Sequence, residues 1–317
     1  MDYVFLIIGL ALITFCADML TRGCVGMAAR FRVPEFIIGL TVMAVGTSMP
    51  ELTVSFMSAL KGSSSMAIGN VTGSNIFNTL VILGICAMIR PVEITRENVR
   101  RDIPICIGVS LLLWIATADR LFRISPEDTI NRVEGIILLL LYVATIIYSI
   151  RSARKEGAAE QADDNSPKMG WMKIIVFIIV GLAGLIYGGN MCLDSATAIA
   201  RAWGVSESII AITIVAAGTS LPELASSISA IVSGKPSLAL GNILGSNVAN
   251  ILLILGASAS VSPLTMGDIT QIDLGMVVVS AVLLLLSALM MGKRRITRLE
   301  GVIFFMFYVA YVIVLMK

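Results

Sequence analysis

The sequence contains no histidine, and charged residues make up only 14% of its 317 positions. The absence of histidine removes the side chain that most often carries protons near neutral pH. Charged residues are roughly a quarter of an average soluble domain, whereas this chain is 57% hydrophobic and has a mean hydropathy of +0.94. The composition therefore excludes an ordinary soluble domain and indicates a polytopic membrane protein.

Cysteine is also scarce, and the net charge is small. The five cysteines are odd in number and none is arranged as C-x-x-C, so the sequence predicts neither a disulfide framework nor a thiolate metal site. The formal net charge of +2 is too small to suggest a nucleic-acid partner. What the chain does contain is long apolar runs, and a lipid bilayer is the environment that such runs require.

The apolar runs predict an all-α fold that crosses the membrane ten times. A spanning helix needs ~20 apolar residues, and measuring the chain against that length gives ten segments. The segments are Tyr3 to Leu20, Phe36 to Leu60, Met66 to Ile89, Ile103 to Ala118, Ile130 to Ile150, Met172 to Cys192, Ile209 to Val232, Leu238 to Ser258, Leu274 to Met291 and Gly301 to Met316.

One sizeable hydrophilic stretch, Arg151 to Lys168, separates the fifth segment from the sixth. We therefore expect a first five-helix repeat at residues 1–150, a linker at residues 151–170 and a second five-helix repeat at residues 171–317. Because each half holds an odd number of spans, the second half must enter the membrane from the opposite side. Inverted repeats of this kind are typical of secondary transporters, in which broken helices form the substrate site near the bilayer midplane.

Lysine and arginine are distributed unevenly among the connections. If the N-terminus is outside, seventeen of the 23 basic residues fall on the inner side and six on the outer side. Cytoplasmic loops carry the excess of these residues. We therefore expect both termini outside and the central linker in the cytoplasm, with the chain in a prokaryotic inner (plasma) membrane.

One stretch occurs twice. Gly46 to Asn78 reads GTSMPELTVSFMSALKGSSSMAIGNVTGSNIFN, and Gly218 to Asn250 reads GTSLPELASSISAIVSGKPSLALGNILGSNVAN, with a constant shift of 172 positions. Between Gly39 and Gly84 this shift keeps 22 of 46 positions identical, mainly glycine and polar residues. A shared apolar composition does not produce such a match, so the chain contains an internal duplication.

Each copy places a glutamate inside an otherwise uncharged span. Glu51 and Glu223 each follow a proline, Pro50 or Pro222. An ionisable residue at this depth costs at least ~2.5 to 3.5 kcal/mol on insertion scales and usually marks a pathway or site. The proline removes a backbone donor and interrupts the helix, which frees carbonyl oxygens for another partner. The carbonyls expected to lose their helical partners are those of Ala44 to Gly46 and Ala216 to Gly218.

Small polar residues surround each glutamate in the sequence. Hydroxyl groups precede it within the same turn, and the following span repeats amides and hydroxyls every four residues, which places them along one helix face. Such residues also occur as packing elements between membrane helices, but two matching Pro-Glu sites favour a cation site. The hydroxyls are Thr47, Ser48, Thr219 and Ser220, and the repeating residues are Asn70, Ser74 and Asn78 with Asn242, Ser246 and Asn250.

These donors are all oxygen atoms. Carboxylate, amide, hydroxyl and carbonyl oxygens suit Ca²⁺, which accepts six to eight of them at ~2.3 to 2.6 Å, and they do not suit Zn²⁺ or Cu⁺. Two carboxylates also match the charge of one divalent ion. No cofactor is indicated.

The paired G-T-S-x-P-E-L and G-N-x-x-G-S-N-x-x-N motifs resemble the alpha repeats of the cation/Ca²⁺ exchanger superfamily, in the form typical of prokaryotic Na⁺/Ca²⁺ exchangers. The resemblance covers essentially the whole chain. Several members have Asp at the place of Asn250, so ion stoichiometry and K⁺ dependence are not carried over. The ligands that the resemblance implies are Glu51, Thr47, Ser48, Ser74 and Asn78, with Glu223, Thr219, Ser220, Ser246 and Asn250, and the carbonyls of Ala44 and Ala216.

The sequence thus predicts an antiporter, not an enzyme, that exchanges Ca²⁺ for Na⁺ by alternating access. A Ca²⁺/H⁺ antiporter is the nearest alternative, although histidine is lacking and so is the G-N-x-x-E sequence that the proton-coupled branch resembles. A cation channel is the least favoured transport interpretation. An intramembrane enzyme is the least favoured function of all, because the motifs offer no nucleophile with a base. The sequence leaves K⁺ participation and oligomeric state open.

Overall fold

Nearly all regular structure in the protein is helical, because a helix satisfies its own backbone groups inside a bilayer. The computed structural model describes residues 1–118, 128–155, 169–204, 216–267, 269–290 and 294–315. These residues form two units, Met1–Pro50 with Ile150–Ile243, and Glu51–Ser149 with Leu244–Lys317. Each unit therefore contains residues from both copies of the duplicated stretch.

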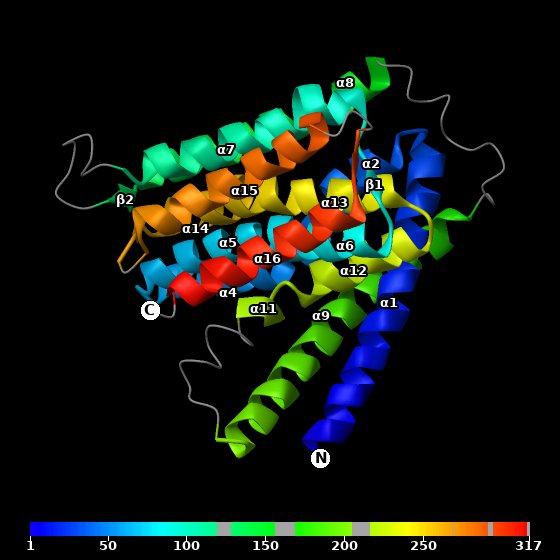
Figure 1. Ribbon diagram of the computed structural model, residues 1–317, viewed down its shortest axis with the longest axis horizontal. Coiled ribbons are helices and arrows are strands. Elements are labelled where there is room, and N and C mark those ends of the chain that lie inside the picture. Colours follow the sequence, from blue (N-terminus) through cyan, green and yellow to red (C-terminus); the bar gives the residue numbers. More distant parts are fainter. Residues whose placement is uncertain (119–127, 156–168, 205–215, 268, 291–293, 316–317) are drawn as a thin grey trace. The chain divides into compact units, whose positions relative to one another are not determined.

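The first unit is built around two long helices, α1 and α9 (Figure 1). Helix α1 ends where Arg32 adopts a left-handed backbone conformation, with φ 52°, two residues before Pro34. The elements of this unit are α1 (Asp2–Phe31), α2 (Glu35–Ile38), the π-helical turn η1 (Gly39–Met43), α3 (Ala44–Thr47), α9 (Trp171–Ala202), α11 (Ala216–Gly218), α12 (Leu221–Val232) and the first part of α13 (Pro236–Ala249).

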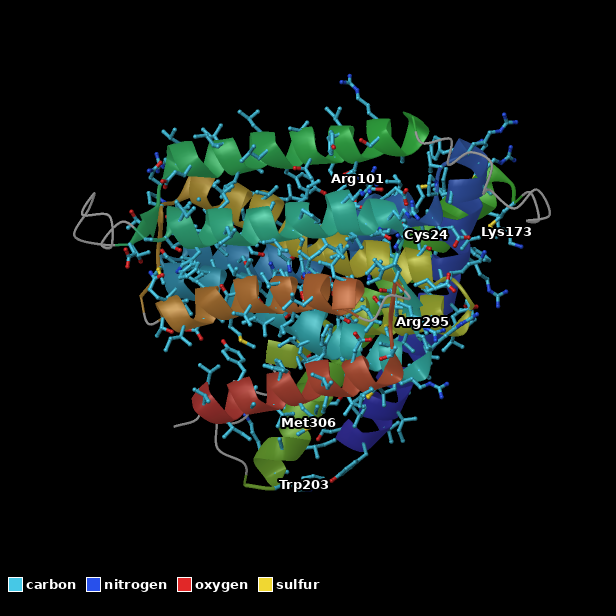
Figure 2. The ribbon with its side chains drawn as sticks, turned by 45° about the horizontal axis from the view of Figure 1, so that its top comes forward. Cys24, Arg101, Lys173, Trp203, Arg295 and Met306 are labelled. Atoms are coloured by element: carbon cyan, nitrogen blue, oxygen red, sulfur yellow. The ribbon has the colours of Figure 1, made fainter. Side chains whose placement is uncertain are left out.

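Helices α1 and α9 lie side by side and run antiparallel (Figure 1). Figure 2 shows Cys24, near the end of α1, close to Lys173, near the beginning of α9. Glycine permits the close approach, because a Cβ atom on Gly181 would lie 2.9 Å from the backbone nitrogen of Leu20 and 3.0 Å from the carbonyl oxygen of Cys16. Small residues play this part in membrane helix pairs, where backbone contact replaces hydrophobic burial.

A second close crossing joins η1 to α13. A Cβ atom on Gly241 would lie against the carbonyl of Phe36 and 3.0 Å from the backbone nitrogen of Leu40, and one on Gly39 would lie against the carbonyl of Leu238. By contrast, a Cβ atom on Gly73 of the first copy would meet no described atom within 4 Å.

The second unit contains most of the remaining helices. Within it, α7 packs beside α15, and α16 packs beside α6 (Figure 1). Its elements are α4 (Met49–Leu60), α5 (Ser64–Phe77), η2 (Asn78–Ile82), α6 (Leu83–Ile89), β1 (Val92–Glu93), η3 (Asn98–Asp102), α7 (Ile103–Ala116), β2 (Thr129–Ile130), α8 (Arg132–Lys155, except its last turns), η6 (Asn250–Leu255), α14 (Gly256–Val261), β3 (Leu264–Thr265), α15 (Gln271–Met290), β4 (Arg295–Ile296) and α16 (Arg298–Leu315).

Two short antiparallel strand pairs connect the two halves of the sequence within this unit. Strand β1 pairs with β4, and β2 pairs with β3. Adding 172 to the residue numbers of β1 gives those of β3, so the duplication extends into the strands. Strands β1 and β3 each follow the duplicated stretch of their own half, whereas β2 and β4 each precede the last helix of their own half. Each pair therefore joins a strand of one half to a strand of the other.

Seven described helices are long and apolar enough to cross a membrane, and an eighth span is formed if the bent pair Glu35–Thr47 and Met49–Leu60 is counted as one. The chain is therefore an all-α membrane protein with several spans. The predicted segment Ile103 to Ala118 corresponds to α7, which has only 14 residues. The start of the segment Ile209 to Val232 and most of the linker 151–170 lie outside the described residues.

The crossing at Gly241 gives a first prediction. The change Gly241→Ala forces a methyl group against the backbone of η1, and overpacking of this kind costs ~1–3 kcal/mol. We expect the unfolding midpoint in detergent to fall by roughly 5 °C, measured by thermal unfolding followed by size-exclusion chromatography. Gly108→Ala is the control, because a Cβ there meets no described atom within 4 Å. Equal midpoints for the two variants would show that the crossing is not tight.

Candidate cation-binding site

Each Pro-Glu pair forms the first turn of a new helix. In the first copy α3 ends at Thr47, α4 begins at Met49, and the two helices are bent by 49°. In the second copy α12 begins at Leu221, directly after Ser220. Proline is tolerated in a first turn because the N–H it lacks has no intrahelical acceptor there. The break predicted at the first copy is confirmed, and both glutamates lie at the positive end of a helix, which favours negative charge.

The prediction that Ala44 loses its helical hydrogen bond is wrong. The backbone N–H of Ser48 donates to the carbonyl oxygen of Ala44 at 3.0 Å, and the Thr47 hydroxyl also approaches this oxygen at 3.4 Å. The Ser48 N–H also lies against the carbonyl oxygen of Gly46. Gly46 is four positions before Pro50, and proline has no N–H to donate to that oxygen. The helix break therefore affects the carbonyl of Gly46 more than that of Ala44. A carbonyl oxygen has two lone pairs, so Ala44 is still able to accept a cation.

Glu223 brings the two copies together in the first unit. Its Oε1 accepts a hydrogen bond of 2.7 Å from the Ser48 hydroxyl, which belongs to the other copy. The side chain is only 1% exposed, and its Oε2 has no hydrogen-bond donor among the described residues. The hydroxyl oxygen of Thr219, one turn earlier, is likewise buried without a described partner.

Asn70 and Asn242 occupy corresponding places in the two copies and tie neighbouring helices together. The Asn242 amide donates to the hydroxyls of Ser226, at 3.2 Å, and Ser227, at 3.0 Å, which links α13 to α12. The Asn70 amide donates to the Ser55 hydroxyl at 2.9 Å, which links α5 to α4. The sequence placed both residues on the face of the presumed ligands. In the structure their N–H groups point to the preceding helix, and Asn242 Oδ1 accepts a hydrogen bond of 3.4 Å from the hydroxyl of Thr47, a presumed ligand.

Four asparagines meet in the second unit. Asn78 Nδ2 donates to Asn247 Oδ1 at 3.2 Å. Asn250 Nδ2 donates to Asn75 Oδ1 at 2.9 Å. These two bonds correspond to one another under the shift of 172 residues, and each joins one copy to the other. Sequence analysis did not single out Asn75 and Asn247, although both occupy the same place in the duplicated G-S-N-x-x-N motif.

A π-helical turn begins at the last asparagine of each motif. The turn η2 starts at Asn78, and η6 starts at Asn250. The extra residue in such a turn alters the direction of the side chains that follow it, and turns of this kind occur frequently at functional sites. The structure thus places both asparagines at a local change of helix geometry that side-chain periodicity in the sequence does not reveal.

The buried side-chain atoms that lack a hydrogen-bond partner among the described residues are all oxygens. In the second unit they include Asn78 Oδ1, Asn250 Oδ1 and the Ser246 hydroxyl. Hydroxyls that were not predicted as ligands, those of Thr72, Ser149 and Ser258, also lack a partner among the described residues, so an unpaired hydroxyl alone is weak evidence for a ligand. Amide and carboxylate oxygens can only accept, and leaving such a group buried and unsatisfied costs ~1–3 kcal/mol. These acceptors suit a cation.

The predicted ligands divide between the two units, and those whose side-chain burial is described are buried except for the half-buried Thr219. Among the described residues, no three or more His, Cys, Asp or Glu side chains lie close enough together to hold a metal ion. The first unit holds Ala44, Thr47, Ser48, Ala216, Thr219, Ser220 and Glu223. The second unit holds Glu51, Ser74, Asn78, Ser246 and Asn250.

The sequence profile of the family described as "Sodium/calcium exchanger protein" matches residues 1–151 and 173–317. The chain belongs to the sodium/calcium exchanger family. The resemblance carried by the duplicated motifs is therefore confirmed, and this exchanger is a membrane transporter.

Individual relatives cover almost the whole exchanger. The putative antiporter CaxA of Alkalimonas amylolytica is 35% identical over 97% of this chain and 96% of its own length. The sodium/calcium exchanger MaX1 of Methanosarcina acetivorans is 30% identical over 99% of this chain and 98% of its own. Among solved structures, the sodium-calcium exchanger NCX_Mj soaked with Na⁺ and Ca²⁺ superimposes with a TM-score of 0.83 at 28% identity, covering 98% of this chain and 97% of the other.

The two glutamates give the second prediction. Glu51→Gln or Glu223→Gln keeps the side-chain shape but removes a negative charge from a buried site, and the loss of a buried charge partner costs several kcal/mol. We expect either change to reduce Ca²⁺ uptake by the exchanger in proteoliposomes at least ~10-fold.

The matched control is Glu35→Gln. Glu35 pairs with Lys235 at 2.7 Å but is partly exposed, and exposed ion pairs contribute only ~0–1 kcal/mol. This variant should retain uptake close to that of the unmodified exchanger. Normal uptake by both the Glu51 and the Glu223 variants would contradict their assignment as ligands.

Proposed function

We propose that this exchanger moves Ca²⁺ in one direction against Na⁺ in the other. The observation that carries the proposal is the set of buried oxygen acceptors, contributed by both copies of the motif, that have no donor among the described residues. The names of the relatives support it, because MaX1 is a sodium/calcium exchanger and NCX_Mj was soaked with these two ions.

The charge and the chemistry of the proposed ligands fit Ca²⁺. Glu51 and Glu223 together carry two negative charges, which balance one Ca²⁺ or two Na⁺. Six to eight oxygen ligands are usual for Ca²⁺, and the neutral oxygens supply the rest. The proposed neutral ligands are Thr47, Ser48, Ser74, Asn78, Thr219, Ser220, Ser246 and Asn250, with the carbonyls of Ala44 and Ala216.

The proposed mechanism is alternating access by a chain with ten spans in two inverted halves. The duplication supports this arrangement. The strands β1 and β3 and the π-helical turns η2 and η6 recur with the same shift of 172 residues. In transporters built from inverted repeats, one repeat or bundle rocks against the other around a fixed site. The two halves of this chain would exchange roles as the site opens to either side.

Two alternative transport modes differ in what drives Ca²⁺. A Ca²⁺/H⁺ antiporter would use the glutamates as proton carriers and would respond to a pH gradient without Na⁺. A cation channel would pass Ca²⁺ down its own gradient without any counter-ion.

A third prediction tests the coupling ion. Proteoliposomes that contain the purified exchanger and are loaded with Na⁺ should accumulate ⁴⁵Ca²⁺ when diluted into Na⁺-free medium, and equal Na⁺ on both sides should abolish the accumulation. Repeating the measurement with choline inside and an imposed pH gradient tests H⁺ coupling, and adding K⁺ tests K⁺ dependence. Uptake that ignores the Na⁺ gradient would overturn the proposal.

The orientation gives a fourth prediction. The excess of basic residues predicts a cytoplasmic linker, so a cysteine introduced by Gln161→Cys should not react with a membrane-impermeant maleimide in intact cells. The same residue should react after the cells are permeabilised. Gln161 lies outside the described residues, and the five native cysteines are buried, so the background reaction should be low. Prompt labelling in intact cells would reverse the orientation.

A further inference from the structure

The hydrogen bonds among the four asparagines of the second unit orient every amide in a definite way. The ligand asparagines Asn78 and Asn250 use their N–H groups on Asn247 and Asn75, respectively. Their own oxygens then remain as acceptors without a described donor. The bonds therefore separate the donor end of each ligand amide from its acceptor end.

Asn75 and Asn247 are themselves fixed by further bonds. Asn75 Nδ2 donates to the backbone carbonyl of Asn247 at 3.1 Å. Asn247 Nδ2 donates to the Thr79 hydroxyl at 2.8 Å. Because the N–H groups of both amides are engaged elsewhere, their Oδ1 atoms are the ends left to accept from Asn250 and Asn78. All four side chains are no more than 3% exposed, so water does not compete for these bonds.

The orientation matters because an amide has two ends of opposite polarity. The oxygen attracts a cation, whereas the N–H₂ group repels it. A ligand asparagine that is free to rotate about its last bond presents the wrong end for part of the time. An arrangement that binds the N–H₂ group therefore pre-organises the oxygen for the ion, which is the usual task of residues behind a metal ligand.

We propose that Asn75 and Asn247 are positioning residues that hold the amides of Asn250 and Asn78 with their oxygens directed at the transported cation. Asn75 of the first copy acts on Asn250 of the second, and Asn247 of the second copy acts on Asn78 of the first. The inference rests on the proposed function, since it assigns a role at the same cation site, but it concerns two residues that do not contact the ion.

The test is a set of double-mutant cycles in full-length protein, with the apparent KM for ⁴⁵Ca²⁺ uptake into Na⁺-loaded proteoliposomes as the readout. Asn75→Ala and Asn247→Ala should each raise the KM about 5- to 30-fold, because each change leaves a buried N–H group of a ligand amide without its acceptor. The maximal rate should change much less.

The crossed pairing gives the decisive comparison. In an Asn250→Ala background, Asn75→Ala should change the KM by less than about twofold, because the amide it positions is absent. In an Asn78→Ala background, the same change should still have its full effect. Asn247→Ala should show the reverse pattern, with coupling to Asn78 and independence from Asn250. A merely structural role would affect all backgrounds alike.

Asn98→Ala serves as the control for general destabilisation. Asn98 is also a buried asparagine whose amide donates to a side chain, Asp102 Oδ2 at 3.0 Å, but it lies outside the duplicated motifs. This variant should keep the KM of the unmodified exchanger even where its unfolding midpoint falls. If the alanine variants do not fold, Asn75→Ser and Asn247→Ser keep a polar group in place while the shorter side chain fails to reach the ligand amide.

The outcomes separate the two proposals. If the unmodified exchanger neither takes up Ca²⁺ nor gains thermal stability from it, the proposed function fails, and the inference fails with it. If the unmodified exchanger transports Ca²⁺ and the Asn75 and Asn247 variants share its KM, only the positioning role is overturned. Equal effects of Asn75→Ala in all backgrounds would overturn it as well.

Discussion

The protein depends on one constraint, which is that a polar atom buried inside a membrane protein must find its partner within the fold or in a bound ion. Among the described residues, every buried side-chain atom that lacks a hydrogen-bond partner is an oxygen, and none is a nitrogen. Donors and acceptors are therefore out of balance in one direction. A cation corrects this imbalance, and an anion or a neutral solute with its own acceptors does not.

The duplication explains why the contacts between the two copies occur in matching pairs. Where two similar segments contact each other, a bond from a residue of one copy to a different residue of the other can be accompanied by the converse bond. Asn78 with Asn247 and Asn250 with Asn75 show this pattern. The close crossing at Gly39 and Gly241 brings segments of both copies together in the first unit, where Ser48 reaches Glu223.

The sequence was sufficient to predict the membrane class, the duplication, the break at Pro50 and the two buried glutamates, because each depends on local chemistry or on exact repetition. It did not predict the roles of Asn70 and Asn242, which depend on which helix each face meets. It also missed the π-helical turns at Asn78 and Asn250. Those turns change the directions of the side chains that follow them, which a regular helical period does not reveal. Asn75 and Asn247 lie three residues before the turns, and their contact with the ligand amides depends on how the two copies pack against each other.

The neutral amide at position 250 makes a hydrogen bond that a carboxylate at this position could not make. Asn250 uses its N–H₂ group as the donor to Asn75 Oδ1, and an aspartate in its place has no such group. The aspartate would leave the Asn75 oxygen facing a carboxylate oxygen unless the Asn75 amide turned around, and that turn would break the bond from Asn75 Nδ2 to the Asn247 carbonyl. The orientation of Asn75 and the identity of the residue at position 250 are therefore linked. In this chain the link keeps the proposed site at two carboxylates, so any cation beyond the first Ca²⁺ or the second Na⁺ would rely on neutral oxygens alone.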